Sequence, residues 1–166
     1  MRHLVAFPIL ALAVILQSAI VSRISLLSGY ADLVLIILIG WALQEGVTTA
    51  WHWAVLAGAM TAIVTGLSWD VPLVGYLLTV LIAQTLQKRT WHAPLIAVFT
   101  VTFLASLVSY LLSFFVLNLA GASLSFGEAF SLVILPSMLL NLMLAVPIYW
   151  LMRDLARWVT PVEEED

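Results

Sequence analysis

Four carboxylates lie within or beside the apolar stretches of this chain, and they are its first candidates for chemistry. They are Asp32, Glu45, Asp70 and Glu128. Ionisable groups at membrane depth are costly to bury and often mark functional sites. Two aspartates that share a proton could form an intramembrane aspartyl protease. Asp32 and Asp70 each precede a run typical of a helix start, however, so capping of a helix N-terminus is the favoured role for both.

No other residue pattern indicates an enzyme or a metal site. The three histidines, His3, His52 and His92, are far apart, and none has a second ligand at metal-binding spacing. Cysteine is absent, which excludes disulfides, thiolate ligands and cysteine nucleophiles. Phosphate-binding loops and nucleophile elbows are also missing. The sequence therefore predicts no catalytic residue, no cofactor and no metal.

The composition is that of an integral membrane protein. Of 166 residues, 64% are apolar and 9% are charged, whereas a soluble domain has roughly a quarter of charged residues. So few charges cannot coat a surface that faces water, and the surrounding solvent must be lipid. The net charge of −3 comes largely from the acidic C-terminus. No basic face for nucleic acid is present.

Continuous apolar runs predict a bundle of six transmembrane helices in a single domain, residues 1–166. The runs cover about residues 4–22, 30–43, 48–67, 71–87, 94–118 and 130–152, and a short acidic tail follows over 159–166. Helices are expected because lipid offers no partners to exposed backbone groups. The apolar body of the second run, Leu33–Leu43, is short. That helix is expected to tilt in a thinned bilayer, to be sheltered by its neighbours, or to be re-entrant.

Basic residues predict the orientation of the bundle. Six crossings leave Arg23 on one side and all other basic residues on the opposite side: Arg2, Lys88, Arg89, Arg153 and Arg157. The positive-inside rule then places both termini in the cytoplasm. Most tryptophans, including Trp41 and Trp53, fall near the predicted ends of the helices, where aromatic rings favour the membrane interface.

Small residues recur at every fourth position of the third run. They are Ala50, Ala54, Gly58, Ala62 and Gly66. In lipid, such a face lets helix backbones approach closely. We interpret it as a packing seam within the chain, and the alternative is a docking face for a partner's helix.

Polar and helix-bending residues mark the last two runs. The fifth run carries a hydroxyl face, and the last carries two prolines and a deep amide: Thr102, Ser106, Ser109, Ser113, Pro136, Asn141 and Pro147. The hydroxyls are expected to bond backbone carbonyls or a neighbouring helix, with a polar path for a solute as the alternative. The prolines predict bends. Asn141 must find partners, in a cross-helix bond or with a bound helix or ligand.

Three sequence fragments occur in a recognisable order. They are Leu16-Gln17-Ser18 leading to Asp32-Leu33; Gly66-Leu67-Ser68-Trp69-Asp70 with Gly75; and Pro136-Ser137-Met138-Leu139-Leu140-Asn141 continuing to Pro147-Ile148-Tyr149. In this order, and at this chain length, they resemble the bacterial rod shape-determining protein MreD family. One departure is Ala31, where that family often has a proline before the aspartate.

The resemblance implies a non-enzymatic scaffold of the Rod complex, or elongasome, in the bacterial cytoplasmic (inner) membrane. Such a subunit supports cell-shape maintenance and lateral peptidoglycan synthesis. The implied direct partner is MreC, through its single membrane helix. The wider complex contains RodA, a class B penicillin-binding transpeptidase and MreB. The family is also similar in fold to the S-components of energy-coupling-factor vitamin transporters.

That last similarity provides an alternative function, a solute-binding membrane subunit of S-component type. It would need a pocket between the fifth-run hydroxyls and the loops around Gly121–Gly127. S-components resemble one another in an Ala-x3-Ala pair on the first helix, which docks their energising partner. The alanines of the first run form no such pair, and this favours the scaffold.

Overall fold

The computed structural model describes residues 2–65, 68–87 and 94–159, and most of them are helical. A two-stranded hairpin separates the first two helices, and the last three helical elements are continuous. The elements are α1 (Arg2–Ala19), η1 (Val21–Arg23), β1 (Ser25–Leu26), β2 (Gly29–Tyr30), α2 (Leu33–Ala42), α3 (Ala50–Val64), α4 (Asp70–Gln87), α5 (Pro94–Leu119), α6 (Phe126–Ala129), η2 (Phe130–Ile134) and α7 (Leu135–Val159). The predicted helical architecture with six helices is confirmed, and the hairpin is an addition that the apolar runs do not predict.

Four helical stretches of the described chain are long and apolar enough to cross a membrane, which is compatible with a multi-pass membrane protein. They are α1 with η1, α4, α5 and the continuous stretch from α6 to α7. The other two helices, α2 and α3, have 10 and 15 residues. At 1.5 Å per residue, α2 is about 15 Å long, half of a hydrocarbon core of about 30 Å.

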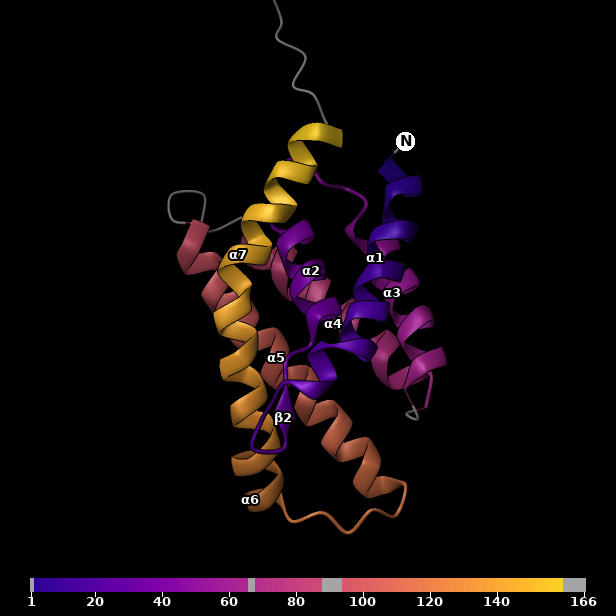
Figure 1. Ribbon diagram of the computed structural model, residues 1–166, viewed down its shortest axis with the longest axis vertical. Coiled ribbons are helices and arrows are strands. Elements are labelled where there is room, and N and C mark those ends of the chain that lie inside the picture. Colours follow the sequence, from indigo (N-terminus) through magenta and orange to yellow (C-terminus); the bar gives the residue numbers. More distant parts are fainter. Residues whose placement is uncertain (1, 66–67, 88–93, 160–166) are drawn as a thin grey trace, which may run out of the picture.

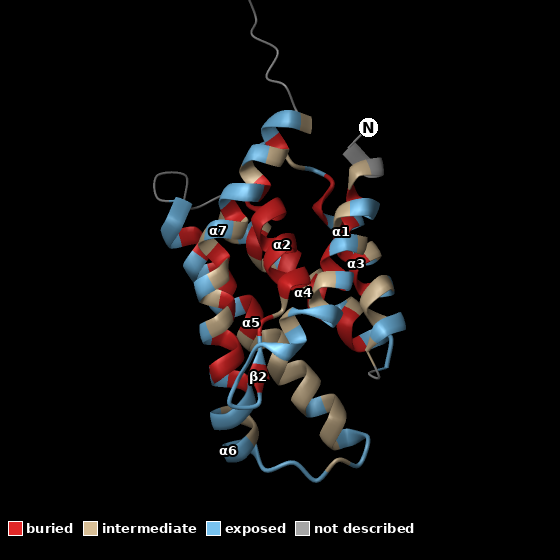
Figure 2. Ribbon diagram, viewed as in Figure 1, coloured by how far each residue is buried: buried red, intermediate tan, exposed pale blue. Residues whose placement is uncertain are grey.

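The short helix α2 lies at the centre of the molecule (Figure 1). All ten of its residues are buried, and it contacts α1, α3, α4, α5 and α7. Figure 2 shows it as a continuously buried element inside a partly exposed ring of helices. A helix that is apolar on every side must be covered on every side. Of the three expectations for the second run, the structure therefore favours shelter by neighbouring helices.

Contacts at both ends of α2 show that α4 and α7 run parallel to it. Beyond its C-terminal end, the Gln87 Nε2 donates to the Gln44 carbonyl at 2.9 Å. A Cβ added to Gly40 would lie 2.9 Å from Cγ of Met152, so α7 approaches α2 closely there. At the N-terminal end, Asp32 is bonded to Asn141 of α7. In Figure 1 the start of α1 and the end of α7 lie at the same end of the molecule.

The tryptophans near the predicted helix ends divide into two groups. Trp41 and Trp53 are fully buried and stack, with ring centroids 4.4 Å apart and an interplanar angle of 17°. The Trp41 Nε1 donates to Oγ1 of Thr49 at 3.2 Å. Trp69 and Trp158 are exposed, as interfacial rings would be. Trp41 and Trp53 thus contribute to packing between α2 and α3 and are not exposed to lipid or water.

The small-residue face of α3 packs inside the chain. Ala50, Ala54 and Gly58 are buried, and Ala62 is half-buried. A Cβ added to Gly58 would lie 2.7 Å from Cα of Leu73, so only a residue without a side chain permits this approach of α4. Gly66, the last member of the predicted seam, lies outside the described residues.

The hairpin packs against the last helical stretch through Gly29. Its strands pair antiparallel, with Ser25 opposite Tyr30 and Leu26 opposite Gly29. A Cβ added to Gly29 would lie 2.6 Å from the Val133 carbonyl oxygen and 2.7 Å from the Ser137 nitrogen. Both are backbone atoms that cannot move aside, so this contact requires glycine.

We predict that Gly29→Ala destabilises the protein because its methyl group would collide with two backbone atoms of η2 and α7. Overpacking of this kind costs about 1–3 kcal/mol. The measurement is the midpoint of thermal unfolding of the purified protein in mild detergent. Gly127→Ala is the matched control because nothing lies within 4 Å of that position. Equal midpoints for the two variants would contradict the close packing of the hairpin.

Candidate functional site

A stretch of non-helical backbone passes through the interior between the hairpin and α2. Gly29 and Ala31 are buried, and α2 begins only at Leu33. Buried peptide groups outside a helix lose their regular partners and cost free energy unless other groups bond them. Side chains and carbonyls from α1, α5, η2 and α7 supply these bonds, and α4 adds a bond to the Asp32 side chain. We call this set the entry network, and its side chains are Gln17, Asp32, Tyr76, Ser106, Tyr110, Ser137 and Asn141.

The proline break of the last helical stretch receives the tip of the hairpin. Pro136 has no N–H with which to bond the carbonyl four residues before it, that of Leu132. The Ser28 N–H donates to this Leu132 carbonyl instead, at 3.0 Å. One turn further, the Tyr30 N–H donates to Ser137 Oγ at 3.1 Å. The π-helical turn η2, directly before Pro136, belongs to the same irregularity.

The amide of Gln17 clamps both sides of the Asp32 residue. Its Nε2 donates to the Ala31 carbonyl at 2.8 Å, and its Oε1 accepts from the Leu33 N–H at 2.8 Å. A primary amide carries both a donor and an acceptor. It can therefore bond one backbone carbonyl and one backbone N–H, as a neighbouring β-strand would. Gln17 lies in the last turns of α1. The clamp therefore ties the end of α1 to the start of α2.

Asn141 is a fully buried side chain of the entry network and bonds three other residues. Its Oδ1 accepts from the Asp32 N–H at 2.7 Å. Its Nδ2 donates to Ser106 Oγ at 2.9 Å and to the Tyr110 hydroxyl at 3.3 Å. Three helices, α2, α5 and α7, thus meet at one amide. This arrangement matches the cross-helix bond expected of Asn141.

Asp32 caps α2 and also bonds α4. Its Oδ1 accepts from the Leu35 N–H at 2.9 Å, as an N-cap does. The Tyr76 hydroxyl of α4 donates to both carboxylate oxygens at 3.3 Å. The Asp70 carboxylate lies elsewhere and is exposed. Helix α4 begins at Asp70 itself, so Asp70 lies in the first turn and not before the helix as predicted. The two aspartates therefore have separate surroundings, and a shared proton is not part of this geometry.

The hydroxyl face of α5 divides between internal bonds and close packing. Ser106 accepts from Asn141, and Ser113 donates to the Ser109 carbonyl at 3.0 Å. Ser109 Oγ would lie 3.5 Å from a Cβ added to Gly75 of α4. Buried Thr102 Oγ1 and Ser109 Oγ have no hydrogen-bond partner among the described residues. Ser106 and Ser109 thus serve contacts with α7 and α4.

Of the two prolines predicted to bend the last run, Pro136 lies at an irregular turn, whereas Pro147 lies within a continuous helix. Pro136 follows the π-helical turn, and the helix that contains it begins at Phe126 and not near residue 130 as predicted. Pro147 lies inside α7. No group of three or more histidine, aspartate or glutamate side chains could hold a metal ion within the described chain. The side chains of the entry network form hydrogen bonds with the backbone around Asp32 and with one another.

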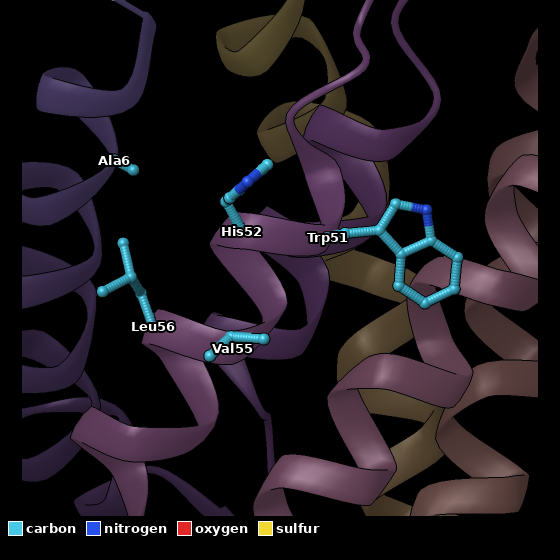
Figure 3. Close-up of a pocket in the computed structure, with 5 residues that line it drawn as sticks. All are labelled: Ala6, Trp51, His52, Val55 and Leu56. Atoms are coloured by element: carbon cyan, nitrogen blue, oxygen red, sulfur yellow. The ribbon is translucent and has the colours of Figure 1, made fainter.

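A second candidate site is an open apolar groove between α1 and α3, with a volume of about 690 Å³. Its lining residues are Ala6, Trp51, His52, Val55 and Leu56. Figure 3 shows His52 and Leu56 on the side of α3 that faces Ala6, whereas the Trp51 ring extends away from α1. Ala6 is buried at 1% exposure, while Val55 is 49% exposed. The groove is thus a surface on which another apolar segment can lie.

Comparison of the chain with protein-family models, with curated proteins and with solved structures gives no match. The first and third fragments that carry the family resemblance nevertheless come together in space. Gln17 and Asp32 belong to the first fragment, and Ser137 and Asn141 belong to the third. Gly75 of the second fragment precedes Tyr76.

Sequence reasoning missed three members of the entry network. Tyr76, Tyr110 and Ser137 have ordinary surroundings in the sequence, and their partners lie 31 to 107 residues away. The hairpin itself had one weak signal, the Ser28-Gly29 pair between two apolar runs.

We predict that Asn141→Leu destabilises the protein because it leaves the Asp32 N–H without an acceptor. A buried polar group left unpaired costs about 1–3 kcal/mol. Thermal unfolding in detergent measures the effect. Gln84→Leu is the control: it makes a comparable change in α4, where the Gln84 side chain forms no bond with the rest of the described structure. An Asn141→Leu midpoint as high as that of the control would refute a supporting role for Asn141.

A second pair of variants separates the capping role of Asp32 from its charge. Asparagine caps helices about as well as aspartate, so Asp32→Asn is expected to keep the wild-type unfolding midpoint. Asp32→Leu removes the bond to the Leu35 N–H and is expected to cost about 1 kcal/mol. Thermal unfolding compares the two. If Asp32→Asn is as damaging as Asp32→Leu, the negative charge itself is required.

Proposed function

We propose that this protein is a non-enzymatic membrane scaffold of the bacterial Rod complex, which binds the membrane helix of MreC. The wider assembly would include RodA, a class B penicillin-binding transpeptidase and MreB. The proposal combines the resemblance of the three fragments to the MreD family with the geometry of two sites. The observation that supports it most directly is the groove between α1 and α3.

The entry network supports a structural role for the polar side chains. Each oxygen and nitrogen of the Gln17 and Asn141 amides takes part in a hydrogen bond. Both carboxylate oxygens of Asp32 accept hydrogen bonds. Groups bonded in this way hold the entry of α2 and are not free to bind a substrate. A scaffold needs such a fixed framework to hold its helices, and so its docking surface, in place.

The groove offers the kind of surface that a single membrane helix requires. Two of its lining residues, Trp51 and Val55, are exposed on one face of α3, and Ala6 contributes a small side chain from α1. Helix association in lipid depends on van der Waals contact and close approach, which small side chains permit. The seam residue Gly58 packs against α4. Partner binding is therefore assigned to the groove and not to the seam.

Charge supports an orientation with both termini in the cytoplasm of the bacterial inner membrane. Arg153 and Arg157 lie near the C-terminal end of α7, whereas Arg23 ends η1, next to the hairpin that bonds Leu132 and Ser137 in the first part of the same helical stretch. The Arg153 guanidinium is 3.8 Å from the centroid of the Trp150 ring, a pairing suited to an interface. Six crossings follow if α2 connects the two sides inside its sheath of helices. Lys88, Arg89 and the acidic tail lie outside the described residues.

The test is recovery of MreC with the tagged protein, solubilised in mild detergent from its native membrane. Val55→Trp would fill the groove from an exposed position, so we expect about tenfold less MreC, as a clash of 1.4 kcal/mol would produce. Ile63→Trp is the matched control on the same helix, where the side chain is 85% exposed and lies outside the lining residues. It is expected to recover MreC as the wild type does.

Three other outcomes would contradict the proposal. Wild-type protein that recovers no MreC would refute the scaffold function. Equal recovery by Val55→Trp and Ile63→Trp would refute the groove as the docking surface. Recovery of a transporter ATPase with its coupling subunit, or of a tightly held small solute, would favour the S-component alternative.

A further inference from the structure

The hairpin presents an apolar tip to its surroundings. Ile24, Leu26 and Leu27 are exposed at 62%, 44% and 67%, although the hairpin is anchored firmly by Gly29. The turn between the strands is Leu27-Ser28, as the pairing of Leu26 with Gly29 requires. Exposed apolar tips are unfavourable in water. The tip is therefore suited to an apolar environment.

The backbone at Leu27 shows that turn geometry does not explain this choice of residue. Its φ is +55°, a left-handed conformation. Glycine, asparagine and aspartate adopt this conformation readily, whereas for leucine it costs about 1 kcal/mol or more of conformational free energy. A leucine here is unfavourable for the turn itself. What it adds to the tip is an apolar side chain.

Distances along the last helical stretch place the tip at a membrane boundary. The Ser28 N–H bonds the Leu132 carbonyl, and Leu132 belongs to the same continuous helical stretch as Arg153. At 1.5 Å per residue these two residues are about 30 Å apart. This is the thickness of a hydrocarbon core, about 30 Å. With Arg153 at one boundary, the hairpin lies at the other.

The charge next to the tip fits the phosphate layer of lipid. Arg23 is exposed and ends η1, directly before Ile24. Residues 20–31 contain no acidic side chain. A guanidinium bonds phosphate oxygens in pairs, and an apolar residue beside it can enter the acyl region. We infer that the hairpin is an interfacial anchor, which inserts Leu26 and Leu27 into the leaflet opposite Arg153 and bonds lipid phosphate through Arg23.

Such an anchor would hold the entry of α2 at a fixed depth. The same hairpin bonds η2 and α7 through Ser28 and Tyr30. Lipid on its outer side would oppose its withdrawal from the proline break. This inference does not depend on the partner of the scaffold, because it concerns the protein and lipid alone.

The absence of native cysteine permits a clean test with single spin labels. Leu26→Cys and Leu27→Cys are labelled separately with a nitroxide, and the protein is placed in nanodiscs of phosphatidylglycerol and phosphatidylethanolamine. Collisions with oxygen, which partitions into lipid, are compared with collisions with a water-soluble nickel chelate. Ile63→Cys, 85% exposed on α3, is the lipid control, and Glu45→Cys, in the exposed turn after α2, is the aqueous control.

Both hairpin labels are expected to resemble the Ile63 label, with oxygen collisions dominating. In addition, Arg23→Gln with the Leu26 label is expected to raise collisions with the nickel chelate, because the anchor loses its phosphate contact. If either hairpin label resembles the Glu45 label, the proposal is overturned. Hairpin labels that become protected only when MreC is added would equally overturn it, and would identify the tip as a protein-binding surface.

Discussion

The structure depends on one constraint, that backbone polar groups inside a membrane must find partners within the protein. A regular helix meets this constraint by itself, but the stretch from Ser28 to Asp32 is not helical. The protein meets it there with side chains from helices far apart in the sequence. The amides of Gln17 and Asn141 are suited to this task because each offers one donor group and one acceptor, as a peptide unit does.

The shortness of α2 brings its ends under the same constraint. A helix of ten residues cannot cross the bilayer alone, so its two ends lie within the bundle and its entry needs polar neighbours. Helices α4, α5 and α7 both cover its apolar surface and contribute to the entry network. Packing and hydrogen bonding therefore act on the same helices. A lateral shift of α5 or α7 would expose apolar surface and break bonds at Asn141 together.

Much of the helical fold could be predicted from the sequence, because long apolar runs in lipid have few alternatives to helix. The start of α5 at Pro94 and the short second helix are examples. The partners of each face could not be predicted. The spacing of Gly58 indicates close packing but not that Leu73 fills the space. Burial of Trp41 and Trp53 likewise depends on the neighbours of α2, which no local pattern encodes.

Only two members of the candidate site, Asp32 and Asn141, could be predicted from the sequence to need hydrogen-bond partners. Asp32 before an apolar run indicates a cap, and Asn141 in a deep position requires partners. The bond between Asn141 and the Asp32 backbone depends on the hairpin. Its strands have two residues each, which is too short for a hydrophobic pattern to predict. The apolar tip of that hairpin and the groove beside α1 are likewise properties of the assembled bundle. The proposed function uses the groove and not the polar interior, because the polar side chains of the interior are bonded within the fold.

The most direct test of this account is hydrogen exchange of individual backbone amides, measured by NMR on the protein in nanodiscs. The amides of Tyr30, Asp32 and Leu33 are non-helical or stand at a helix start, yet each is bonded to a side chain of another helix. The account predicts that they exchange as slowly as the amides inside α2. Exchange as fast as that of Ser123, in the exposed turn before α6, would contradict it, because the entry network would then not hold the backbone.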